Sequence, residues 1–142
     1  MPTQPGPPRE EPIGLYIQRV AKELNRAFDA ALSEVGGNAP TWLILVSLKS
    51  GRPETQRELA DAVGIRGATL THHLEGLERN GLVARERDPN NRRVQKVALT
   101  DAGEEAFQRM FKTVVAFDSQ LRDGFTDKEL ETLRKLLGRL TE

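Results

Sequence analysis

The chain has 142 residues, of which 37% are hydrophobic and 30% charged, a balance that is ordinary for one soluble domain. Its 21 basic and 21 acidic residues cancel, so any argument for a polyanionic partner must rest on a local patch. The absence of cysteine excludes disulfides, thiolate zinc sites, cysteine nucleophiles and thiol-based redox sensing.

The N-terminal segment, residues 1–12, is rich in proline and lacks an apolar stretch. We therefore predict a disordered arm rather than a signal peptide or an anchor. The longest apolar run, Trp42–Val46, is far shorter than the ~20 residues of a membrane-spanning helix. Together these features predict a cytoplasmic protein.

Residues 13–35 place apolar side chains at every third or fourth position, which predicts a long amphipathic helix. The pair Gly36-Gly37 ends this helix. Pro40 suits the first turn of a second helix, which carries Trp42 and Leu45.

Two short helices and a tight turn are predicted next. Thr55 and Glu58 have the spacing of a capping box, and the helix that begins there ends at Gly64. The following helix begins after the turn 64–67 and stops at Asn80-Gly81. This spacing is typical of a helix-turn-helix.

A β-hairpin follows, with strands at 82–87 and 93–99 separated by the turn-forming segment 88–92. Thr100 then begins a helix whose first turn is acidic, and its apolar stripe runs from Phe107 to Leu121. A second capping box at residues 126–129 begins the last helix.

The helix after the tight turn has an apolar face and a face of small and hydrogen-bonding residues. At about 100° per residue, Leu70, Leu74 and Leu77 point inward. The other face suits the floor of a major groove, where polar side chains meet base edges. Alternatively, this face of the helix is only a solvent-exposed surface. The candidate recognition residues are Arg66, Gly67, Ala68, Thr69, Thr71, His72 and Arg79.

Positive charge is concentrated on this helix and the hairpin. Residues 66–96 contain seven basic and four acidic side chains, a net charge of +3 that leaves −3 for the rest of the chain. Arg92 at the hairpin tip could enter a minor groove, whose negative potential attracts guanidinium groups. The candidate wing residues are Arg85, Arg87, Asn90, Asn91, Arg92 and Arg93, and the candidate supporting contacts are Thr55, Gln56 and Arg57.

Four stretches carry a resemblance to a known family. They read LADAVGI at 59–65, LTHHLEGLERNGLVAR at 70–85, DPNNRR at 88–93 and LTDAG at 99–103. The helix-turn-helix part alone would fit many regulators. In this order, with one long helix before and two helices after, the chain resembles the MarR family of transcriptional regulators from Ile13 onward.

The resemblance implies a mainly α-helical fold with a small β-hairpin wing, a winged helix-turn-helix at residues 38–100. It also implies a homodimer formed by the N- and C-terminal helices, residues 13–36 and 101–142, although those apolar stripes could instead serve the core of one subunit. The candidate interface residues are Ile13, Ile17, Phe117, Leu121, Leu133 and Leu137.

The implied function is sequence-specific binding of double-stranded DNA at a pseudo-palindromic operator, as a repressor. In many relatives a small aromatic or anionic ligand enters a cleft between the dimer helices and the winged domain and changes the spacing of the two DNA-binding lobes. Trp42 and Leu45 could line such a cleft here, or both could simply pack in the core. Asn91 stands where the family usually has an aspartate that braces the wing through the arginine two residues later, here Arg93. A neutral amide cannot form that ion pair with Arg93.

Metal binding, catalysis and protein docking are the alternatives to DNA binding, and the sequence disfavours the first two. His72 and His73 are adjacent on a helix and diverge by about 100°, so they cannot chelate one metal ion together. The sequence has no nucleophile elbow and no phosphate-binding glycine loop, so we expect no catalytic residues and no cofactor. A winged helix that docks a protein instead of DNA shares every fold signal, but it should expose an apolar patch on the second helix.

Overall fold

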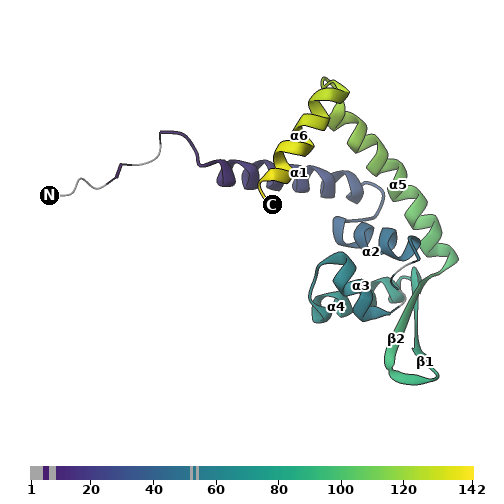
Figure 1. Cartoon of the computed structure of the whole chain (residues 1–142). Helices are drawn as coiled ribbons and strands as arrows, with labels where there is room; N and C mark the ends of the chain where they lie inside the picture. The colour runs from purple at the N-terminus through teal and green to yellow at the C-terminus, as the bar shows by residue number, and fades with distance from the viewer. Residues whose placement is uncertain (1–4, 7–8, 52, 54) are drawn as a thin grey trace.

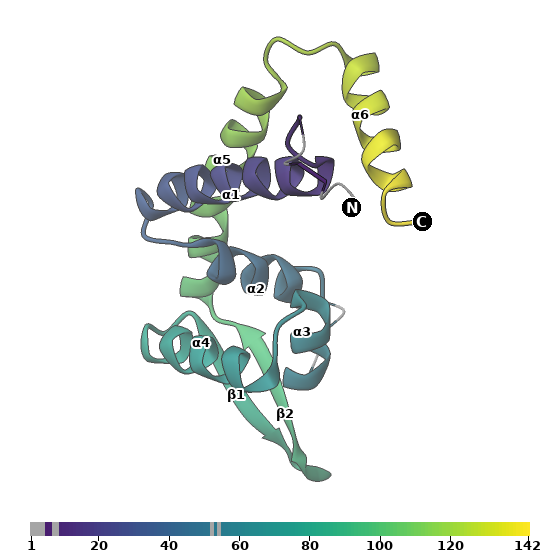
Figure 2. The ribbon, with the colours of Figure 1, turned by 90° about the vertical axis from the view of Figure 1, so that its left-hand side faces the viewer.

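The computed structural model describes residues 5–6, 9–51, 53 and 55–142. Its elements in chain order are α1 (Ile13–Ser33), α2 (Ala39–Lys49), α3 (Gln56–Val63), α4 (Gly67–Arg79), β1 (Val83–Asp88), β2 (Asn91–Leu99), α5 (Asp101–Arg122) and α6 (Asp127–Arg139). The hairpin projects from one end of the molecule, and α1, α6 and the far half of α5 form the other end (Figures 1 and 2). The predicted class, mainly helical with a small hairpin wing, is confirmed.

The junction between α1 and α2 is fixed by polar contacts. The first helix ends at Ser33, two residues before the predicted Val35, and Gly36 follows with a positive φ of 79°. The Asp29 carboxylate of α1 accepts a hydrogen bond from the Ala39 amide at 2.7 Å, and Asn38 caps the Thr41 amide. The start of α2 is therefore held against α1 by side chains that satisfy its free N–H groups.

The helix-turn-helix forms as the sequence predicts. The Thr55 hydroxyl accepts from the Glu58 amide at the start of α3, and Gly64 ends this helix in the left-handed conformation that favours glycine. The hydrophobic core of the helix-turn-helix region joins α2, α3, α4 and the hairpin. The buried members of this core are Ile44, Leu59, Ala60, Leu70, Leu74, Leu77, Val83 and Val97.

A second core joins α1, α2 and α5. Trp42 stacks on Phe107 with ring centroids 5.4 Å apart, and Leu32, Leu45, Ala106 and Met110 complete the buried set. Leu82 and Leu99, at the base of the hairpin, pack against both cores. The hairpin and the helix-turn-helix are thus tied to α5 by shared packing.

The hairpin differs from the prediction at its tip. The turn consists of residues 89–90 alone, so Asn91 and Arg92, expected in the turn, lie in β2. Asp88 pairs with Asn91 whereas Arg87 pairs with Gln95, which leaves residues 92–94 in a bulge. The predicted turn was too long because the Asp88 carboxylate accepts from the Asn90 amide and closes a tight turn.

The base of the hairpin meets the start of α5 at a close contact. The Thr100 hydroxyl accepts from the Gly103 amide at 3.0 Å, and the Thr100 amide donates to the Leu82 carbonyl at 3.1 Å. A Cβ on Gly103 would lie 2.0 Å from the Leu82 carbonyl oxygen. Only glycine therefore permits this approach of α5 to the hairpin.

The far end of the molecule leaves apolar side chains uncovered. Helix α6 begins with the predicted capping box of Thr126 and Glu129 but contains no buried residue. Leu121, predicted in the buried stripe of α5, is exposed. The large apolar residues exposed on α1 and from Leu121 onward are Ile13, Leu15, Tyr16, Leu24, Leu121, Phe125, Leu133, Leu136, Leu137 and Leu140.

The predicted N-terminal arm lies partly outside the described residues, which omit 1–4 and 7–8. In the part that is described, Glu11 forms an ion pair with Arg19 of α1 at 2.8 Å. Across the described residues, no helix combines the length and the hydrophobicity needed to cross a bilayer.

Candidate nucleic-acid interface

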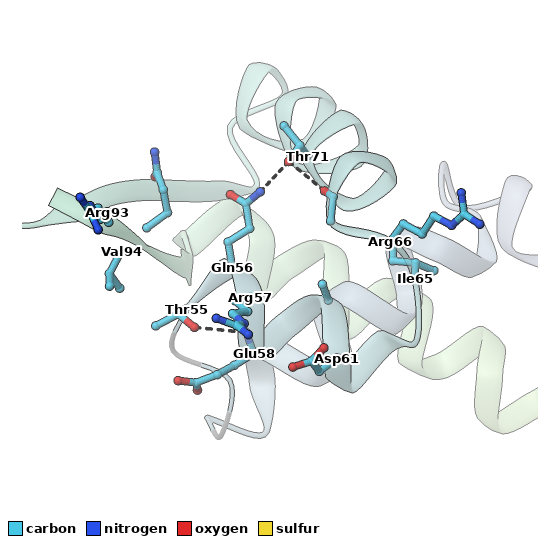
Figure 3. A pocket seen from close by; sticks show the side chains of 13 residues that line it. Thr55, Gln56, Arg57, Glu58, Asp61, Ile65, Arg66, Thr71, Arg93 and Val94 are labelled. Carbon is cyan, nitrogen blue, oxygen red and sulfur yellow. Dashed lines mark hydrogen bonds between the residues drawn. The ribbon is translucent and has the colours of Figure 1, made fainter. Parts of the chain in front are cut away.

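A groove of about 880 Å³ opens between the start of α3, the start of α4 and strand β2 (Figure 3). An isolated bridge between Thr55 and Lys96 holds the entry of α3 beside β2 and thereby sets one edge of the groove. The lining residues are Thr55, Gln56, Arg57, Glu58, Ala60, Asp61, Ile65, Arg66, Gly67, Thr71, Arg93, Val94 and Gln95. The groove thus brings together predicted residues of the supporting, recognition and wing groups.

Charged side chains line this groove on several sides. Arg57, Arg66 and Arg93 are exposed, and Arg66 and Arg93 lie at opposite ends of the view in Figure 3 with Gln56 between them. Two acidic residues, Glu58 and Asp61, also line it. Three guanidinium groups against two carboxylates leave a modest positive excess, which suits a polyanion approached from outside more than a buried anion.

The start of α4 is open to close approach. Among the described residues no side chain caps its N-terminus, and a Cβ added to Gly67 would meet nothing within 4 Å. The adjacent Ala68 and Thr69 are exposed. The free N–H groups at this end carry the positive pole of the helix dipole and can bind phosphate oxygens.

Two further predicted recognition residues lie along the same helix. His72 and Arg79 are exposed, whereas His73 is partly buried. The described part of the chain holds no group of three or more His, Asp or Glu side chains suited to a metal ion. The two histidine rings are 6.1 Å apart, centroid to centroid, and tilted by 58°.

Thr71 is less available than predicted. Its hydroxyl donates to the Gly67 carbonyl at 2.9 Å and accepts from the side-chain amide of Gln56 at 2.6 Å. The predicted base-reading residue is therefore hydrogen-bonded on both sides within the protein. No pattern in the sequence pointed to this link, because the two residues are 15 positions apart and on different helices.

Arg85 also has a hydrogen-bond partner within the protein. Its guanidinium forms a two-pronged contact with the Glu78 carboxylate, through Nε at 3.3 Å and Nη2 at 3.2 Å, and thereby joins β1 to the end of α4. This hydrogen bond holds the pKa of Glu78 below its ordinary value. Arg85 was predicted to contact DNA; the structure gives it an internal partner.

The remaining wing residues face solvent. Arg87, Asn90, Asn91, Arg92 and Arg93 are exposed. Asn91 does contact Arg93, but its side-chain oxygen accepts from the Arg93 backbone amide at 3.2 Å. The Asn91 side chain thus fixes the backbone of the bulge. Among the described residues, no hydrogen bond joins this side chain to the Arg93 guanidinium.

The residues proposed for a ligand cleft lie in the second core. Leu45 is fully buried and Trp42 is 8% exposed. Trp42 contacts Phe107 and, at a centroid distance of 6.4 Å, Phe111. Packing accounts for both side chains, and their part in a ligand site stays a prediction.

Comparison with known proteins finds this geometry to be similar to that of one family. The family model described as the MarR family matches residues 38–94, which contain the helix-turn-helix and most of the hairpin. Beyond the matched residues, the support comes from solved structures that align over nearly the whole chain.

A mutant of MarR from E. coli, solved in complex with operator DNA, is 26% identical and has a TM-score of 0.82; the match covers 92% of this chain and 94% of that one. A transcriptional regulator of the MarR family from Rhodococcus sp. RHA1 is 27% identical with a TM-score of 0.76, over 90% and 91%. The repressor CouR, bound to a 23-mer DNA duplex, has a TM-score of 0.84 at 23% identity over 92% and 93%, and at that identity the likeness concerns the fold.

Proposed function

We propose that the chain is a member of the MarR family and a homodimeric regulator of transcription, which binds double-stranded DNA at specific sequences and acts as a repressor. The observation that carries the proposal is the groove in which α3, α4 and β2 meet around Arg57, Arg66 and Arg93. A DNA-bound relative at 26% identity has the same fold over nearly its whole length.

In the proposed mechanism, the start of α4 enters the major groove. Its uncapped N–H groups and the exposed arginines would bind phosphates, while the exposed Thr69 and His72 would contact base edges. The wing reaches the flanking minor groove with Arg92. Two subunits related by a two-fold axis would read half-sites about one helical turn, ~34–36 Å, apart.

The dimer is proposed to form through α1, α5 and α6. Among the described residues, the leucines of α6 and the apolar start of α1 are exposed, and α6 stands clear of α1 in Figure 2. Leu133 and Leu136 line a groove beside Phe125 that is largely apolar. Such exposed patches on a small chain mark an association surface.

The proposed role as a repressor has consequences for localisation, catalysis and ligand binding. We infer a cytoplasmic regulator without catalytic activity, since a repressor acts on chromosomal DNA by binding alone. A small aromatic or anionic ligand that loosens DNA binding remains part of the proposal. The competing role of docking a protein lacks its expected apolar patch, because the residues Ala68, Glu75 and Arg79 on α4 are exposed and two of them are charged.

The salt dependence of duplex binding tests the proposal. Fluorescence anisotropy of a labelled duplex from a genomic or random pool, at several salt concentrations, should give a log-log slope of roughly −0.9 for each phosphate neutralised. With several contacts per dimer, the affinity should fall steeply. A flat response, or no binding at low salt, would overturn DNA binding as the function.

A further inference from the structure

Gln56 and Thr71 form a hydrogen-bond chain whose direction can be deduced. The Gly67 carbonyl can only accept, so the single hydroxyl proton of Thr71 is used in the 2.9 Å bond to Gly67. The Gln56 atom that faces Thr71 at 2.6 Å must then be a donor, which is the amide nitrogen. The orientation of the Gln56 amide is therefore set by the protein.

The amide oxygen of Gln56 is consequently directed away from Thr71, toward the side on which β2 lies (Figure 3). Within the described part of the chain this oxygen has no hydrogen-bond partner. It is also not a buried unsatisfied atom, and Gln56 lines the groove. The protein thus presents one oriented acceptor to whatever enters the groove.

An acceptor in this position discriminates among the parts of a duplex. Phosphate oxygens only accept, so they cannot bond to it. In the major groove the donors are the exocyclic amines of adenine and cytosine, whereas guanine and thymine present keto oxygens. A fixed acceptor therefore favours an amino base over a keto base on one particular strand.

We propose that Gln56 is a base-reading residue and that Thr71 is a positioning residue that holds its amide with the oxygen outward. The proposal rests on DNA binding as the proposed function and reverses the roles that the sequence suggested for these two residues. It specifies a preference for A or C over G or T at one position on one strand of each half-site.

Selection of bound duplexes from a random-sequence pool, followed by affinity measurements on single-base variants, tests this assignment. Wild type should prefer A or C over G or T at one position by roughly fivefold, the effect of one neutral hydrogen bond. Gln56→Met, which keeps the length but removes the amide, should lose that preference. Thr71→Val should weaken the preference at the same position, because the side-chain amide of Gln56 loses its acceptor and can flip.

Thr71→Ser is the matched control, since it keeps the hydroxyl and should keep the preference. Melting curves check that every variant is folded, and Gln56→Met and Thr71→Ser keep the test decisive if Thr71→Val does not fold. If wild type selects a sequence but Gln56→Met or Thr71→Val retains its full preference, the assignment is wrong while DNA binding stands. If wild type binds no duplex, the proposed function itself fails.

Discussion

Some arginines of this interface have a hydrogen-bond partner within the protein, whereas others are exposed to solvent. Arg85 is largely buried and bonded to Glu78, whereas Arg87 on the same strand is exposed. A guanidinium already bonded to a carboxylate has less to offer a phosphate. Arg85 therefore belongs to the scaffold that joins the wing to α4, and the exposed arginines are proposed to contact DNA.

The first prediction concerns this ion pair. Because the pKa of Glu78 is lowered in the folded chain, the pair stabilises the fold above the ordinary glutamate pKa, and the stabilisation is lost as pH falls through the lowered value. Arg85→Ala should raise the pKa of Glu78 toward its ordinary value, as measured by NMR titration of the carboxyl carbon. Arg87→Ala is the control and should leave it unchanged; an ordinary pKa in wild type would refute the pairing.

The second prediction concerns the wing. Arg92 is exposed beside the tight turn and is proposed to neutralise DNA charge without reading bases. Arg92→Ala should weaken binding to all duplexes and make the salt slope shallower by roughly 0.9 for each phosphate that the arginine neutralises in wild type. Arg109→Ala, an exposed arginine of α5, should change neither quantity. Weaker binding to one sequence alone would contradict the assigned role.

At the scale of elements, the junction between the hairpin and α5 determines how the wing is held. Thr100 begins α5 and bonds to the base of the hairpin, while Gly103 lets α5 approach the Leu82 carbonyl. The leucines at positions 82 and 99 belong to both cores. Movement of α5 is therefore expected to move the hairpin with it.

Gly103→Ala tests this contact. Its Cβ would lie 2.0 Å from a backbone oxygen, so the chain must shift, at a cost of roughly 1–3 kcal/mol of unfolding free energy by analogy with overpacked cores. Gly76→Ala, where the nearest atom would be 3.8 Å away, should be neutral or stabilise α4 by up to about 1 kcal/mol. Urea unfolding measures both, and equal stability of the two variants would contradict the close approach.

The elements themselves were predictable from local chemistry. The caps at Thr55, Thr100 and Thr126 and the stop at Gly64 are local signals, and the helices begin and end where these signals stand. The bulge at 92–94 was not predictable, because it depends on strand register rather than on residue type.

The candidate site was predictable only in part. Helical periodicity identified the exposed face of α4, and charge counting identified the wing. The bonds from Gln56 to Thr71 and from Arg85 to Glu78 join different elements, so only the folded chain brings the partners together. A sequence can suggest that a residue is polar and exposed, but not that another part of the protein already holds it.

At the scale of the whole molecule, apolar surface is gathered at the end opposite the wing. Helix α6 buries no residue within the chain, although its leucines recur at helical spacing. A stripe of this kind is stable in water when a second surface covers it. We therefore expect the folded unit in solution to be a dimer.

A charge placed in this stripe should weaken the dimer. Leu133→Glu combined with Leu137→Glu should convert the dimer to monomer, because an unpaired carboxylate would be buried at each position. Sedimentation equilibrium measures the change. Lys135→Glu, at an exposed position of the same helix, is the control and should remain dimeric. A wild-type chain that is monomeric at micromolar concentration would contradict the interface.

Sequence-specific binding by a symmetric dimer is best tested by a hydroxyl-radical footprint of the wild-type protein on a duplex selected from a random pool. Two protected segments related by two-fold symmetry, about one helical turn apart, are the expected result. Each should extend into the flanking minor groove where the wing is proposed to lie. Protection of one unpaired half-site, or no protection at low salt, would contradict sequence-specific binding by a symmetric dimer.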